Sequence, residues 1–181
     1  MAKMNFDTFI DKIVLAGQTY SAAQAAGYKF TILKDSLKIK QGVRGAFIYA
    51  NFGGLIPTET GRNIWQHEAT FNLDCVAINS GSSTETGDEK SLERLRYLIG
   101  QVLDFILNPN DRDLGMTVGD VANLQVKNVT PFPLDIVTEL GVQGLRVVVT
   151  AEFNDEASAT GDTLEQITVT SPTWGAVFDN E

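Results

Sequence analysis

The chain has 181 residues, a length typical of one domain; 43% of the residues are hydrophobic and 20% are charged. A compact chain of this size buries roughly 70% of the surface that its unfolded form exposes, which is enough to build a core. No apolar run approaches the ~20 residues of a membrane-spanning helix, and the beginning, MAKMNFDTFIDKIV, lacks the pattern of a signal peptide. The single cysteine, Cys75, excludes an internal disulfide and a cysteine-based zinc site. We therefore expect a globular protein of a reducing compartment.

The net charge of −9 belongs entirely to the second half of the chain. Residues 1–90 carry nine basic and nine acidic residues, whereas residues 91–181 carry five basic and fourteen acidic ones. The basic residues of the first half gather in one stretch, namely Lys29, Lys34, Lys38, Lys40 and Arg44. The acidic residues that follow the last base include Glu152, Asp155, Glu156, Asp162 and Glu165. Such surfaces serve either for solubility alone or as two halves of a head-to-tail contact that closes a ring, and under the second interpretation these ten residues form a subunit interface.

The N-terminal segment predicts a short helix, because apolar residues recur at helical spacing from Phe6 onward and Gly17 supplies a stop. Residues 18–27 have weak periodicity, which fits either irregular structure or a second helical turn. Strands are expected at residues 28–33 and 42–50, where apolar and polar residues alternate imperfectly.

Residues 51–66 are predicted to form a long loop, because they contain a glycine pair, a proline and a further glycine. Residues 70–78 then alternate as a strand does, and this alternation places Cys75 on the buried face. His67 is expected at the edge of that strand. A zinc-protease motif beginning at His67 would need a second histidine where Phe71 stands.

The longest helix follows a polar loop at residues 79–87. Thr86 stands three residues before Glu89, which is the spacing of a capping box. Apolar residues then keep helical spacing over several turns until Pro109, since the residue before a proline avoids the helical conformation.

Two more strands are expected at residues 121–129 and 145–153, where apolar residues alternate with polar ones. They are joined by a connection at residues 130–144 with two prolines and two glycines, and loops of that length usually contact something. Weak alternation returns over residues 165–181.

The elements predict an α+β domain over residues 1–155, with a mostly antiparallel β-sheet and extended loops. The N-terminal helix and the one long amphipathic helix are expected on one face of the sheet. An acidic C-terminal arm, residues 156–181, forms either an edge strand or a segment that docks on a neighbour. Four residues of the loops and arm are predicted to contact partners, with core packing as the alternative for the tryptophans: Trp65, Phe132, Leu134 and Trp174.

The sequence contains little that enzymatic catalysis would require. With one histidine, no nucleophile–base pair can be built around imidazole, and no catalytic residue is predicted. The glycine-rich stretch 81–87 has the wrong spacing for a phosphate loop, and residues 108–113 depart from a calcium-binding loop, so neither a metal nor a cofactor is expected. An enzyme whose carboxylates meet only in the folded chain stays open; the acids considered are Glu68, Asp74 and Asp104.

Three segments in fixed order resemble one family of virion proteins. They are the strand-like TGRNIWQHEATFNLDCVAI, the helical EKSLERLRYLIGQVLDFIL and the strand-like GLRVVVTAEFND. Together with the N-terminal helix and the Ser/Gly/Thr loop, they are similar in layout to the tail terminator (tail completion) proteins of tailed bacteriophages. The resemblance covers about residues 65–155 and depends on the order and character of the elements.

The resemblance implies a structural virion protein, assembled in the host cytoplasm, that forms a hexameric ring at the end of the tail tube. Such a ring stops the polymerisation of tube and sheath and joins the tail to the head connector. DNA would pass through it without specific binding, and the acidity of the chain agrees, because backbone binding needs Lys and Arg. Two alternatives stay open: another neck, connector or tube protein of the same machinery, and a small monomeric binding module of a bacterial cell.

Overall fold

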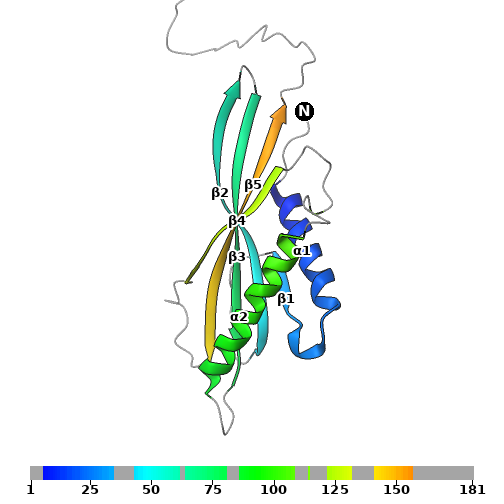
Figure 1. Ribbon diagram of the computed structural model, residues 1–181, viewed down its shortest axis with the longest axis vertical. Helices are drawn as coiled ribbons and strands as arrows, with labels where there is room; N and C mark the ends of the chain where they lie inside the picture. The colour runs from blue at the N-terminus through cyan, green and yellow to red at the C-terminus, as the bar shows by residue number, and fades with distance from the viewer. Residues whose placement is uncertain are drawn as a thin grey trace, which may run out of the picture.

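A computed structural model describes residues 6–34, 43–61, 64–80, 86–108, 114, 122–131 and 141–156 (Figure 1). The described residues form two α-helices, one 3₁₀ turn and five strands, and the predicted α+β class is confirmed. In chain order these are α1 (Phe6–Ala22), η1 (Ala26–Tyr28), β1 (Thr31–Lys34), β2 (Gly45–Gly61), β3 (Ile64–Ile78), α2 (Gly87–Ile106), β4 (Ala122–Pro131) and β5 (Val142–Glu156).

The five strands form one sheet in the order β1-β2-β3-β5-β4. β1 runs parallel to β2, and the other neighbouring strands are antiparallel. Both helices lie on one face of the sheet and cover only part of its length, so that β2, β3 and the end of β5 extend beyond them (Figure 1). The sheet therefore has a covered half and a projecting half.

The core lies between the helices and the sheet. Alternation along β3 turns Phe71, Leu73 and Cys75 toward the helices, and all three are inaccessible to solvent. The ring of Phe9 on α1 lies 4.7 Å from the ring of Phe71 and 5.3 Å from that of Phe153 on β5. The predicted burial of Cys75 is confirmed, and this burial raises the pKa of its thiol.

The predicted capping box at the start of α2 is confirmed. The Glu89 backbone N–H donates to the Thr86 hydroxyl at 3.2 Å, and the Thr86 backbone N–H donates to the Glu89 carboxylate at 2.8 Å. The Glu89 carboxylate accepts hydrogen bonds from the Thr86 backbone N–H and, at 3.0 Å, from the Thr86 hydroxyl, and these two bonds, the backbone one first, lower the pKa of Glu89. The N-terminal end of α2 is thus fixed by its own sequence.

The prediction that Gly17 ends the first helix is wrong, because α1 continues to Ala22. A Cβ at position 17 would lie 2.9 Å from the Ile32 side chain on β1. Glycine at this position lets α1 approach the sheet closely, and it does not act as a helix stop.

The predicted loop at residues 51–66 is also wrong, since β2 and β3 run through it as a long antiparallel hairpin. Gly54, at φ +152°, lies where the register shifts after Phe52, so this glycine marks a bulge within the strand. Pro57 is tolerated because β1 pairs only with residues 47–50, so that no described strand lies on the outer side of β2 at the proline.

The strands β4 and β5 extend further into residues 130–144 than expected, because residues without a strand pattern of their own pair there with a neighbouring strand. β4 reaches Pro131, opposite Leu145, and β5 begins at Val142, opposite the last residue of β3. The predicted loop at 130–144 is therefore too long at both ends. His67 lies within β3 between Pro57 and Phe153, so its predicted position at a strand edge is wrong.

Candidate interaction surfaces

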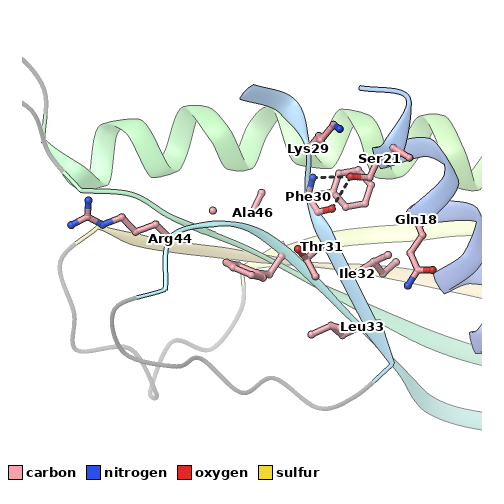
Figure 2. Close-up of a pocket in the computed structure, with 12 residues that line it drawn as sticks. Gln18, Ser21, Lys29, Phe30, Thr31, Ile32, Leu33, Arg44 and Ala46 are labelled. Carbon is pink, nitrogen blue, oxygen red and sulfur yellow. Dashed lines mark hydrogen bonds between the residues drawn. The ribbon is translucent and has the colours of Figure 1, made fainter. Parts of the chain in front are cut away.

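A groove lies beside β1, between the second half of α1 and the start of β2 (Figure 2). It has a volume of about 540 Å³ and opens to solvent. Ser21 on α1 binds the edge of the sheet here, because its hydroxyl donates to the Phe30 carbonyl at 2.7 Å and accepts from the Phe30 N–H at 2.9 Å. The residues that line the groove are Gln18, Ser21, Ala22, Lys29, Phe30, Thr31, Ile32, Leu33, Arg44, Gly45, Ala46 and Phe47.

Two of the predicted basic interface residues, Lys29 and Arg44, line this groove and are exposed. Neither forms an ion pair with a described residue. Lys34 differs, because its ammonium lies 2.9 Å from Asp11 and 3.5 Å from Asp7 on α1. The hydrogen bond to Asp11 raises the pKa of Lys34. Lys34 therefore ties β1 to α1, whereas Lys29 and Arg44 are the described members of the basic stretch that have no ion pair with a described residue.

The described part of the acidic region lies diagonally across the sheet from the basic one. Arg44 precedes the end of β2 that lies opposite Ile78, whereas Glu152 and the residues after it form the far end of β5. The two ends of β5 are about 45 Å apart at the usual rise of a strand. Arg44 and Glu152, the described members of the two regions, therefore lie near opposite ends of the sheet.

The remaining predicted interface and contact residues are not placed by the structure. Trp65, Asp155 and Glu156 lie in β3 and β5, but the structure describes only their backbone. The others lie outside the described residues; they are Lys38, Lys40, Asp162, Glu165, Phe132, Leu134 and Trp174.

A polar cluster on the face of the sheet away from the helices was not predicted. Arg146 on β5 donates from Nε and Nη2 to the two oxygens of Asp74 on β3, at 2.6 and 3.1 Å. Asn51 on β2 donates to the same carboxylate at 3.3 Å and accepts from Asn72. The Asp74 side chain is only 3% exposed, and its hydrogen bonds raise the pKa of Arg146. The cluster joins the three central strands in register; residues 72 apart in sequence meet here, so no local pattern indicates it.

The three carboxylates considered for acid–base chemistry do not share a site. Asp74 pairs with Arg146 on the open face of the sheet, and Glu68 lies 3.2 Å from the Lys127 ammonium. Asp104 on α2 accepts a hydrogen bond from Tyr20 at 2.9 Å. Among the described residues no group of three or more His, Cys, Asp or Glu side chains is placed to hold a metal ion. No helix in the described part is long and apolar enough to cross a membrane.

An exposed aromatic pair on the helical side was also missed. The rings of Tyr28 and Tyr97 stack with centroids 4.3 Å apart, and the Arg94 guanidinium lies 5.8 and 5.9 Å from the two centroids. Arg94 also donates to the Lys29 carbonyl at 2.7 Å. This cluster holds the segment before β1 against α2.

No protein-family model matches the chain, and no curated protein matches it in sequence. Any statement of function therefore depends on the residues and surfaces described above.

Proposed function

We propose that this protein is a structural component of a phage tail that resembles the tail terminators. In this role it forms a ring at the end of the tail tube, stops the polymerisation of tube and sheath, and joins the tail to the head connector in the virion. Its partners would be further copies of itself, the tube and sheath proteins and the connector, while DNA passes without specific binding.

The observation that carries the proposal is the order and packing of the elements. Helix α1 comes first, and the strands β1, β2 and β3 follow it. The long helix α2 comes next, and the antiparallel pair β4 and β5 comes last. Both helices lie on one face of the sheet. This layout agrees with the one on which the resemblance depends. It is a likeness of fold, and folds serve many functions, so the surfaces must supply the rest of the support.

The surfaces supply two features that suit head-to-tail assembly. Basic Lys29 and Arg44 lie near one end of the sheet and the acidic end of β5 lies near the other, an arrangement that suits pairing between copies. Opposite patches on one subunit give heterologous contacts, which close into a ring when the rotation allows. The acidic surplus also disfavours retention of DNA on the ring.

The direct test is deletion of the gene from the genome that encodes it, followed by electron microscopy of the particles. We expect heads and tails to stay unjoined and the tails to exceed their normal length, because nothing ends polymerisation. A plasmid copy of the wild-type gene should restore joined particles of normal length, which controls for effects on neighbouring genes. Normal, infectious particles in the deletion strain would contradict the proposal.

One observation favours a second function, a small binding module. The groove beside β1 is open and carries two cationic side chains, Lys29 and Arg44, that could hold an acidic ligand. This alternative predicts a stable monomer, which native mass spectrometry over a concentration series distinguishes from a ring.

A further inference from the structure

The groove beside β1 combines apolar surface with positive charge (Figure 2). Leu33, which is 44% exposed, and the half-buried Phe47 both line it. Lys29 and Arg44 line it as well, and neither forms an ion pair with a described residue. The volume of about 540 Å³ lies within the range of roughly 300–1,000 Å³ that is typical of pockets for small ligands. The groove therefore suits a short segment in which apolar side chains stand beside carboxylates.

One segment of the chain has this composition. Residues 174–181, WGAVFDNE, contain Trp174 and Phe178, followed by Asp179 and Glu181. No basic residue occurs after position 146, so these carboxylates have no residue of opposite charge near them in the sequence. Tryptophan is among the residues that most often anchor a protein interface. This stretch, which we call the acidic aromatic segment (residues 174–181), matches the groove in both charge and apolar character.

Only one other stretch outside the described residues combines an aromatic ring with acids. This stretch is residues 132–140, FPLDIVTEL. Both of its ends are held, because Pro131 pairs with β5 and the Gly141 carbonyl accepts a hydrogen bond from the backbone after β3. The acidic aromatic segment is joined to Glu156, the last described residue, through the seventeen residues 157–173, so it can reach much further.

The reach of this connection indicates which copy receives the segment. β5 ends at Glu156, which pairs with Ile64 of β3, whereas the groove lies level with Asp74 to Ile78 of β3. The two places are roughly 33–46 Å apart along the sheet at the usual rise of a strand. A random coil of seventeen residues spans only roughly 21–25 Å, so reaching the groove of the same chain requires a stretched connection. A groove on an adjacent copy, which a head-to-tail contact can place nearer, is the better receiver.

We propose that the acidic aromatic segment of one copy docks in the groove beside β1 of the adjacent copy in the ring. Its two aromatic rings cover apolar surface at Leu33, and its two carboxylates pair with Lys29 and Arg44. This inference depends on the proposed function, since it presupposes a ring of identical copies. Each copy would thereby both donate one segment and accept one.

The test is photo-crosslinking in the full-length protein. The photoreactive residue p-benzoylphenylalanine replaces Leu33 in one preparation, which is mixed with wild-type protein labelled with a heavy isotope. We expect a crosslink between position 33 and a heavy peptide that contains residues 174–181. The same replacement at Val129, which is 40% exposed on β4 at the opposite edge of the sheet, is the matched control and should give no crosslink to that peptide.

Further variants test the two kinds of contact separately. Trp174→Ala should reduce the crosslinked product at least about tenfold, whereas Trp174→Phe keeps an aromatic ring and should keep most of it. Lys29→Glu combined with Arg44→Glu should also reduce the product at least about tenfold. Adding Asp179→Lys and Glu181→Lys to that chain should restore it, because opposite charges then meet again.

Three results would overturn the inference. A crosslink confined to the unlabelled chain would mean that the segment occupies its own groove. A crosslink to residues 132–140 would give the groove another occupant, and rings without any crosslink at position 33 would leave it without one. In each of these cases a ring can still form, and the proposed function stands. A monomer under every condition would remove the proposed function, and the inference with it.

Discussion

Replacing Gly141 by alanine is expected to lower the free energy of unfolding by about 3 kcal/mol or more, and the melting temperature by roughly 6–12 °C. Gly141 has a φ of +88°, where an L side chain is strained, and an added Cβ would overlap the Asn79 carbonyl oxygen. The backbone cannot shift freely, because the Gly141 N–H donates to Asp88 at 2.6 Å. Its carbonyl accepts from the Asn79 N–H and from the Ser91 hydroxyl. Thermal unfolding of both proteins measures the effect.

Gly100→Ala is the matched control for this change. Gly100 lies on the exposed face of α2, and a Cβ there would meet nothing within 4 Å. Because alanine favours a helix over glycine, this variant should be more stable than wild type by about 0.5–1 kcal/mol. If Gly141→Ala unfolds within about 1 kcal/mol of wild type, the contact that joins the ends of β3, α2 and β5 at Gly141 is not formed as described.

Replacing Asp74 by alanine is expected to cost about 3 kcal/mol, measured by urea denaturation. The carboxylate is almost fully buried and binds Arg146 through two hydrogen bonds, so its removal leaves a half-buried guanidinium without its main partner. Asn51 loses its acceptor as well. A buried charge that has lost its partner costs more than the pair contributes.

Two further variants distinguish the loss of the Asp74–Arg146 ion pair from the cost of leaving one buried charge alone. Asp74→Asn keeps the shape but removes the charge, and should lose an intermediate amount of stability. The double variant Asp74→Leu with Arg146→Leu removes both charges and should be considerably more stable than Asp74→Ala, since no unpaired charge remains. A loss of less than about 1 kcal/mol for Asp74→Ala would show that this cluster does not hold the central strands together.

Elements whose signal is local were predictable from the sequence. The capping box of Thr86 and Glu89 is read within four residues, and the alternation around Cys75 and along β5 reports directly which side chains are buried. Elements that depend on a distant neighbour were not. Gly17 resembles a helix stop until Ile32 is known to pack against it, and Pro57 resembles a loop residue until the free side of β2 is known.

The candidate surfaces, too, were predictable only where the signal is local. Their charges could be counted along the chain, but their use could not be assigned from composition. Lys34 belongs to the predicted basic patch, yet it pairs with Asp7 and Asp11 of its own chain. The long β2–β3 hairpin could not be foreseen, because the sequence pattern of residues 51–66 predicts a loop, and the pairing that makes these residues strands is known only from the folded chain.

Native mass spectrometry of the full-length protein, over a concentration series at low and high salt, tests most directly whether identical copies of this chain assemble into a closed ring. We predict one discrete closed oligomer, a hexamer, whose population rises with concentration and falls at high salt as the contact between Lys29, Arg44 and the acidic end of β5 is screened. A monomer at every concentration and at both salt levels would contradict the ring and would favour the binding module.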